Sequence, residues 1–160
     1  MAQREAEFRA FVDAHGASLL HAARLLTGDH HRGEDLLQST LIKLYLRWPR
    51  VDEPMAYARK ALVTGQIDVA RRRWFGERPV EAVPESGTPA DVGAVDQRDE
   101  LRRMLATLTP RERALIVLRY YCDLSEQQAA AELGLPLGTV KSSTARALTK
   151  LRVSAHSEAR

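Results

Sequence analysis

The sequence predicts an all-α protein in which two small helical domains are joined by a flexible linker. Apolar residues recur at helical spacing through most of the 160-residue chain. Residues 76–96 lose this periodicity and are rich in proline, glycine and acidic residues, which is the composition of a linker. Residues 124–151 have the pattern of two helices joined by a tight corner, which predicts a helix-turn-helix in the C-terminal domain.

The composition excludes several classes of protein. With 44% hydrophobic and 28% charged residues the chain suits a soluble globular protein, and no apolar run approaches the ~20 residues that a membrane span requires. The N-terminus lacks a signal-peptide pattern, and the single cysteine, Cys122, cannot form an internal disulfide, so we expect a cytoplasmic protein without membrane insertion. Because the sequence has no glycine-rich phosphate loop, metal-ligand cluster or nucleophile–histidine pair, we expect no enzyme activity, cofactor or metal.

The N-terminal domain, residues 1–75, begins with two predicted helices. The first covers about 5–26 and ends at a Thr-Gly-Asp turn, and the second covers about 33–47. The second helix has an apolar stripe made of Leu37, Leu41, Leu44 and Tyr45. Leu36 and Leu46 lie off that stripe, which indicates either core packing on more than one side or a surface for a partner.

A loop and a third helix complete this domain. The loop, 47–54, contains two prolines, two arginines and Trp48, and Pro54 can take the first helical position. The helix continues to about residue 73. The face opposite its apolar residues carries Tyr57, Lys60, Thr64, Asp68 and Arg71. Cations with interleaved aromatic residues favour a nucleic-acid contact, although an ordinary solvated face has the same pattern.

The net charge of +3 conceals two basic blocks. Residues 47–78 carry a net +4 and residues 101–160 a net +5, whereas residues 79–100 between them carry −5. Two basic blocks on either side of an acidic spacer indicate two separate contacts with a polyanion. We expect the two domains to move independently on this tether.

The C-terminal domain, residues 97–160, begins with a helix that starts near residue 96. Capping-box patterns, in which Ser or Thr precedes Glu or Gln by three residues, begin two further helices at Thr109 and Ser125. Gly134 stands where a helix would end in the left-handed conformation, and Pro136 prevents simple continuation.

The last helix, about 136–153, has two different faces. Its core-facing stripe consists of Val140, Thr144, Ala147, Leu148 and Leu151. The opposite face carries Ser142, Ala145, Arg146 and Thr149, with Lys141, Ser143 and Lys150 on its flanks. Short hydroxyls, small residues and cations suit a helix that lies in the major groove of DNA, and the alternative is an ordinary helical corner with a solvated basic face.

These segments, in this order, resemble the extracytoplasmic-function (ECF) sigma factors, which direct bacterial RNA polymerase to promoters. The segment GEDLLQSTLIKLYLRW is similar to the helix that those factors dock on the polymerase clamp. The segment YARKALVTGQIDVARRRW is similar to the helix that reads the near-start promoter element. The run from LTPRER through GTVKS to the final TKLR is similar to their C-terminal domain.

The resemblance implies a transcription initiation factor that binds promoter DNA and the RNA polymerase core, through the β′ clamp helices and the β flap. Residues 1–75 would be sigma region 2, which contacts the core and melts and reads the −10 element. Residues 76–96 would be the flexible acidic linker, and residues 97–160 would be sigma region 4, which reads the −35 element. An anti-sigma factor is a further candidate partner, and the active protein would be associated with the nucleoid in the cytoplasm.

The resemblance also implies individual contact residues. Polymerase contacts would come from Asp35, Leu36, Gln38 and Ile42. The −10 element would be contacted by Trp48, Arg50, Tyr57, Lys60, Thr64, Asp68 and Arg71. The −35 element would be contacted by Thr139, Lys141, Ser142, Ser143, Arg146 and Lys150. The chain departs from the family pattern at Thr64, where asparagine is frequent, and at Pro136 and Leu137, which replace the usual capping pair of the recognition helix.

A stand-alone helix-turn-helix regulator that binds duplex DNA as a dimer is the alternative function. It would share the pattern at 124–151. It would not require the partner helix at 35–48 or a second basic surface that bears aromatic residues. Binding to core polymerase distinguishes the two functions.

Overall fold

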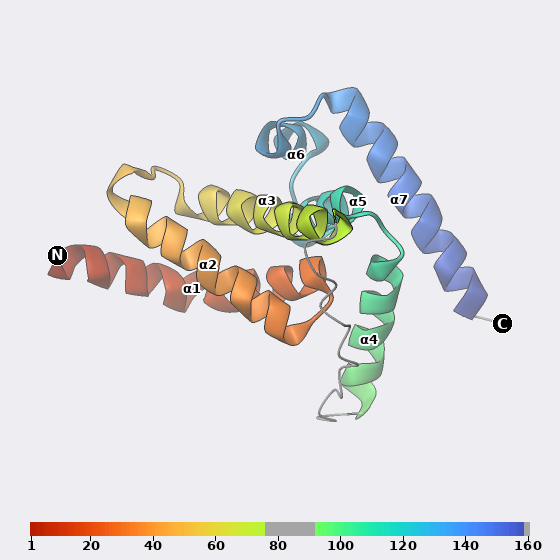
Figure 1. The fold of residues 1–160 in the computed structure, drawn as a ribbon, viewed down its shortest axis with the longest axis horizontal. Coiled ribbons are helices and arrows are strands. Elements are labelled where there is room, and N and C mark those ends of the chain that lie inside the picture. Colours follow the sequence, from red (N-terminus) through yellow and green to blue (C-terminus); the bar gives the residue numbers. More distant parts are fainter. Residues whose placement is uncertain (76–91, 159–160) are drawn as a thin grey trace.

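The computed structural model describes residues 1–75 and 92–158, and every regular element in these ranges is a helix. The N-terminal half consists of α1 (Ala2–Thr27), α2 (His30–Arg47), a short 3-10 turn η1 (Trp48–Arg50) and α3 (Pro54–Trp74). In this half α2 packs against both α1 and α3 (Figure 1). The predicted order of three helices is confirmed.

The C-terminal half consists of α4 (Val92–Ala106), α5 (Pro110–Ile116), a π-helical turn η2 (Val117–Tyr121), α6 (Glu126–Leu133) and α7 (Leu137–Glu158). Because α5 continues directly into η2, the predicted helix over 110–121 changes its hydrogen-bond pattern halfway along. α7 packs against α4, α5 and α6 and continues past its predicted end near residue 153 to the far side of the molecule from the N-terminus (Figure 1).

Side-chain caps define the helix starts of the C-terminal half. Thr109 Oγ1 accepts a hydrogen bond from Glu112 N at 3.2 Å, and Ser125 Oγ accepts one from Gln128 N at 3.0 Å. In each case the second side chain accepts in return from the main-chain N–H of the first residue, so both predicted capping boxes are confirmed. Gly134 ends α6 with φ 65°, the left-handed conformation that glycine adopts without a Cβ clash.

Two helix starts differ from the predicted ones. α2 begins at His30 because the Asp29 side chain accepts a hydrogen bond from a main-chain N–H and caps the helix. α4 begins at Val92, inside the predicted linker over 76–96. The remainder of that linker, 76–91, lies outside the described residues.

The buried face of α2 also differs from the predicted stripe. Leu36, Thr40 and Leu44 are at most 8% exposed, whereas Leu37 is only half-buried. Leu36 sits against α3 at Gly65, where an added Cβ would lie 3.0 Å from Leu36 Cδ1. The predicted stripe is thus right for Leu44, and Leu36 shows that α2 packs against the core on more than one side. Thr40 was missed because its hydroxyl is polar, and a helical stripe through it is hard to recognise from apolar spacing alone.

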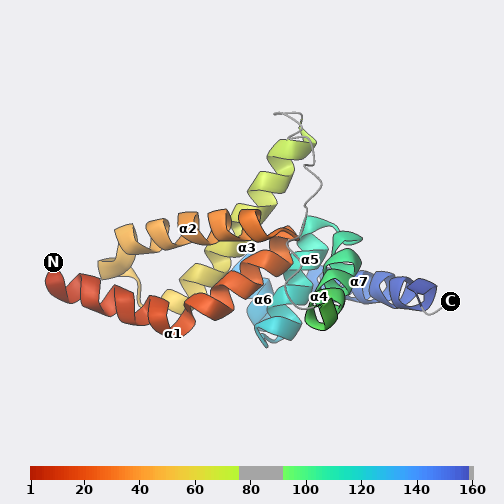
Figure 2. The ribbon, with the colours of Figure 1, turned by 90° about the horizontal axis from the view of Figure 1, so that it is seen from below.

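The two halves share one hydrophobic core. Leu19 of α1 and Leu62 of α3 belong to the same buried cluster as Leu115 of α5 and Leu118 of η2. Figure 2 shows α5 and α6 lying against α1 and α3, in agreement with the contacts between these helices. The halves are therefore in contact in this structure, and the expectation that they move independently in the free chain stays a prediction.

Candidate nucleic-acid and partner-binding surfaces

The outward face of α3 is available to a ligand. Its exposed side chains are Lys60, Thr64, Asp68 and Arg71. The opposite side of the helix buries Leu62 and Val63 in the core, which fixes the rotation of α3 about its axis. The Thr64 hydroxyl donates to Lys60 O at 2.7 Å, so it already satisfies a hydrogen bond within its own helix. The cations at either end of this face can approach phosphates, and Asp68 lies between them.

The aromatic residues near this face are braced by the protein core. The Trp48 ring meets the rings of Phe8 and Phe11 edge-on, with centroid distances of 5.3 and 5.6 Å. Tyr57 is half-buried and packs against the buried hydrophobic core. Arg50 is exposed in η1. The loop after α2 therefore presents a cation beside a rigidly held aromatic group.

α7 carries a second polar surface on its outward side. Lys141, Ser142 and Arg146 are exposed, and Thr139 is half-buried in the first turn. The predicted core stripe is confirmed, with Val140, Thr144 and Ala147 buried. Ser143 is only 5% exposed, because a residue three positions after Val140 and four before Ala147 lies on their side of the helix. The expected contact between Ser143 and DNA is therefore corrected.

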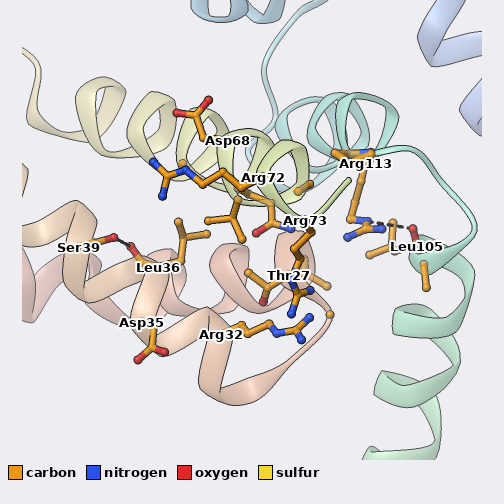
Figure 3. Close-up of a pocket in the computed structure, with 18 of the residues that line it drawn as sticks. Thr27, Arg32, Asp35, Leu36, Ser39, Asp68, Arg72, Arg73, Leu105 and Arg113 are labelled. Atoms are coloured by element: carbon orange, nitrogen blue, oxygen red, sulfur yellow. Dashed lines mark hydrogen bonds between the residues drawn. The ribbon is translucent and has the colours of Figure 1, made fainter. Parts of the chain in front are cut away.

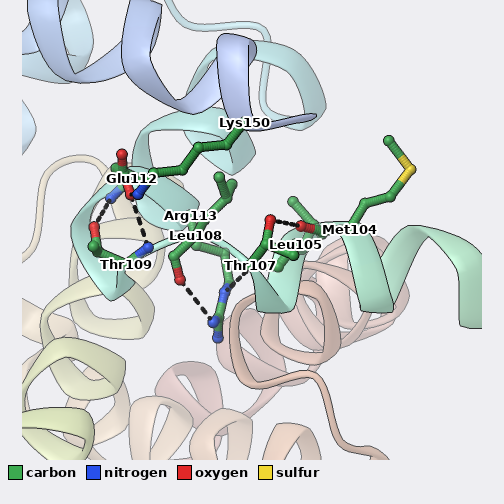
Figure 4. A network of polar contacts seen from close by, with 8 residues as sticks. All are labelled: Met104, Leu105, Thr107, Leu108, Thr109, Glu112, Arg113 and Lys150. Carbon is green, nitrogen blue, oxygen red and sulfur yellow. Dashed lines mark hydrogen bonds and ion pairs between the residues drawn. The ribbon is translucent and has the colours of Figure 1, made fainter. Parts of the chain in front are cut away.

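Lys150 is engaged within the protein. Its Nζ lies 2.6 Å from Glu112 Oε1, which also accepts from Thr109 N at 2.9 Å (Figure 4). Burial raises the pKa of Glu112, but the hydrogen bonds from Lys150 and Thr109 outweigh burial and leave the pKa below its usual range. Glu112 is thus an ionised, buried carboxylate that joins the start of α5 to the middle of α7. Lys150 therefore holds α7 against the start of α5, and its ammonium is paired.

The third surface lies on α2. Asp35 and Gln38 are exposed, and Ile42 and Leu46 are 61% and 70% exposed, respectively. Leu36, which we expected to contact a partner, belongs instead to the core beneath α3. Exposed large aliphatic side chains on one helix indicate a surface for another protein. Leu46 was missed as a contact residue, although its position off the predicted stripe was the signal that could have identified it.

A cleft of about 970 Å³ separates α2 and α3 from α4 and α5 (Figure 3). Its cations are Arg32, Lys43, Arg72, Arg73, Arg102 and Arg113, and its carboxylates are Asp35 and Asp68. Burial lowers the pKa of Arg73, and the nearby Arg32 lowers it further. Within the described residues neither Arg72 nor Arg73 forms an ion pair. The cleft therefore has a net positive charge that a partner could neutralise.

Three other features concern metal binding, membrane spans and the single cysteine. In the two described ranges no group of three or more His, Cys, Asp and Glu residues could hold a metal ion. The helices of these ranges include none that is long and apolar enough to cross a membrane. Cys122 is half-buried, and burial raises the pKa of its thiol.

Sequence comparisons relate the C-terminal half to a protein-family model and nearly the whole chain to curated proteins. Residues 98–151 match the family model described as Sigma-70, region 4. The RNA polymerase sigma-E factor of Streptomyces coelicolor is 36% identical over 91% of this chain and 84% of its own length. The ECF RNA polymerase sigma factor SigL of Mycobacterium tuberculosis is 34% identical over 95% of this chain and 90% of its own length.

Solved structures share the fold. The sigma factor RpoE of Bartonella quintana, in complex with the anti-sigma factor NepR, matches with a TM-score of 0.76 and 25% identity over 94% of this chain and 97% of that chain. CnrH, in complex with the cytosolic domain of CnrY, has the same fold with a TM-score of 0.71 and 22% identity over 98% of this chain and 94% of that chain. Sigma factors are regulators of transcription rather than enzymes. The chain belongs to the ECF sigma factors, and it acts as a transcription initiation factor that binds RNA polymerase and directs it to promoters.

Proposed function

We propose that this sigma factor uses three separate surfaces, on α2, α3 and α7, to bind the polymerase core, the −10 element and the −35 element. The observation that carries this proposal is the position of two exposed polar faces on helices of different halves. Each face is backed by a buried stripe, and each half carries its own net positive charge. Residues 1–75 would act as the core-binding and −10 domain, and the C-terminal half as the −35 domain.

The −35 element would be read by α7. Arg146 lies two turns into the helix on its exposed side, with Ser142 one turn before it and the small Ala145 beside it. An arginine fork can form two hydrogen bonds with a guanine edge, which discriminates against other bases by about 1–3 kcal/mol. Lys141 and Thr139, near the start of the helix, would contact phosphates.

The −10 element would be contacted by α3 and the loop before it. Lys60 and Arg71 would neutralise phosphates at the two ends of the exposed face, and Asp68 would accept a hydrogen bond from a cytosine amino group. Trp48 and Tyr57 would border the site for an unstacked base, because aromatic rings held by the core need no further ordering when a base stacks on them.

The polymerase core would bind α2. Asp35, Gln38, Ile42 and Leu46 combine polar groups with exposed aliphatic area, a composition that suits a protein partner. The β′ clamp helices are the expected partner of this surface, and the β flap that of the C-terminal half. Leu36 would support the surface from below by holding α2 against α3.

An anti-sigma factor is a further proposed partner, since RpoE and CnrH are similar chains solved in complexes, RpoE with its anti-sigma factor NepR. The electropositive cleft between α2, α3 and α5 would favour an acidic segment of such a protein. We also propose that the chain works in the cytoplasm, with the nucleoid when active, and catalyses no reaction itself.

Arg146→Ala tests the reading of the −35 element. Binding of the holoenzyme should be measured on a panel of promoters that differ by single base pairs in this element. The variant should lose preference at one or two positions, whereas Arg152→Ala, an exposed arginine further along α7, should keep the full preference. A uniform loss of affinity for every promoter after Arg146→Ala would contradict base reading by this residue.

A further inference from the structure

The cleft that α2 and α3 form with α4 and α5 has the dimensions and the lining of a ligand-binding site. Its volume of about 970 Å³ lies at the upper end of the range for pockets that hold small molecules. Leu25, Leu36 and Leu105 contribute apolar side chains that are buried or half-buried. Six cationic side chains and only two carboxylates line the same space. A cleft with an apolar wall and an excess of one charge concentrates its field on a small anion.

Two arginines face each other inside this cleft. Figure 3 shows the side chains of Arg32, in α2, and Arg73, near the end of α3, pointing toward one another. Burial and then Arg32 lower the pKa of Arg73, and Asp29 offsets only part of this effect. Arg32 Nε lies 3.5 Å from Asp29 Oδ2, whereas Arg73 forms no ion pair in the described part of the chain. Asp35 and Asp68 point away from the two arginines (Figure 3). Because like charges that face each other repel, an anion between them would stabilise the site.

Positive charge also reaches this place from α4. Burial, and then Arg24 and Arg102, lower the pKa of His30 at the start of α2, so Arg102 lies close to the turn between α1 and α2. The Arg102 guanidinium is 3.8 Å from the carboxylate of Asp99, whose side chain is 48% exposed, and solvent weakens such a pair. Cations from α2, α3 and α4 therefore line one side of the cleft.

An exposed indole stands beside these cations. Trp74 follows Arg73 directly and lines the cleft, although the residue is 85% exposed. An aromatic ring in this position is a platform on which a nucleobase can stack, whatever its sequence. Gln66, half-buried in the same cleft, has an amide that can both donate a hydrogen bond to a base edge and accept one from it. The cleft thus offers partners for phosphates and for a base at the same time.

We propose that this cleft binds a nucleoside oligophosphate. Arg32 and Arg73 would hold the phosphates, because an arginine fork can form two parallel hydrogen bonds with one phosphate group. The base would stack on Trp74, and Gln66 would hydrogen-bond with its edge. An acidic protein segment would meet the same cations but has no ring to stack on the indole, and the two ligands would compete for the cleft.

Titration calorimetry of the whole free chain with ATP, inorganic tripolyphosphate and hexaglutamate tests the site. The chain should bind ATP most tightly, because ATP alone provides both phosphates and a base. Arg73→Ala should weaken the binding of ATP and of tripolyphosphate about tenfold. Arg71→Ala, the same charge change at an exposed position of α3 outside the cleft, is the matched control and should weaken either by less than about twofold. Equal losses in the two variants, or hexaglutamate binding as tight as that of ATP, would overturn the site.

Substitution of Trp74 tests the stacking of the base. Trp74→Ala should weaken ATP binding about tenfold and leave the affinity for tripolyphosphate unchanged, whereas Phe75→Ala, the next exposed aromatic residue, should change neither. In a Trp48→Phe chain Trp74 is the only tryptophan, and ATP should quench its fluorescence while tripolyphosphate should not. Equal losses of ATP and tripolyphosphate binding in Trp74→Ala, or unquenched emission at saturating ATP, would overturn the assignment of a nucleoside. These measurements use neither DNA nor polymerase, so their failure leaves the proposed promoter-reading faces to their own test.

Discussion

Replacing Lys150 with alanine separates a structural lysine from a DNA-contacting one. The variant removes the ammonium that lies 2.6 Å from Glu112 Oε1, while Thr109 continues to donate to the same carboxylate. A buried charge that loses one partner typically costs about 1–3 kcal/mol. The Lys150 side chain is 42% exposed, and solvent weakens such a pair, so we expect a loss of about 1 kcal/mol in the free energy of unfolding.

Urea unfolding and DNA titration together decide which role Lys150 has. The midpoint of unfolding should fall in Lys150→Ala with an unchanged denaturant slope. The dependence of promoter affinity on salt should stay the same, because the ammonium is already paired. Lys141→Ala is the matched control: its exposed ammonium should contribute a released counterion, so the salt slope should fall by about one unit without loss of stability. A reduced salt slope with unchanged stability in Lys150→Ala would refute the reasoning.

The same pair predicts a dependence of stability on acid. Burial raises the pKa of Glu112, but hydrogen bonds from Lys150 and Thr109 lower it below the unfolded value of about 4.3. A carboxylate with a depressed pKa stabilises the fold above the unfolded pKa, and this contribution disappears as the pH falls through the folded value. Glu112→Gln keeps an acceptor for Thr109 but no charge, so its stability deficit should be largest near neutral pH and shrink below about pH 4.

Two pairs of substitutions test the partner surface and the packing of the N-terminal half. Ile42→Arg should abolish binding to core polymerase and leave the unfolding midpoint unchanged, because Ile42 is 61% exposed. Leu36→Ala truncates a buried core residue and should lower the free energy of unfolding by about 2–5 kcal/mol. A stable Ile42→Arg protein that still binds core would reject the α2 surface. Gly33→Ala places a Cβ 2.7 Å from Arg24 Cγ and 3.1 Å from the Arg24 main chain, so it should destabilise the protein, while Gly138→Ala, which meets open space, should not. Equal unfolding midpoints for these two glycine variants would contradict the close approach of α1 and α2.

Helix caps made much of the C-terminal half predictable from sequence. The Thr109 and Ser125 capping boxes and Gly134 act within a few residues of the chain, so their patterns determine the helix ends directly. The surroundings of Lys150, by contrast, depend on a distant contact. In the sequence, Lys150 has the pattern of a DNA-binding cation. Its partner Glu112 is 38 positions away, and only the fold brings the two side chains together.

The docking of the two halves could not be predicted for a related reason. Leu115 and Leu118 have the spacing of an ordinary core stripe, and nothing in that spacing distinguishes a core within one half from a core shared by both. Arg59 likewise lies next to the DNA-facing Lys60 in sequence, yet points to α6 because successive residues on a helix are about 100° apart. Two neighbouring residues of α3 therefore have different surroundings: Lys60 is exposed to solvent, whereas Arg59 pairs with Glu132 in the other half of the chain.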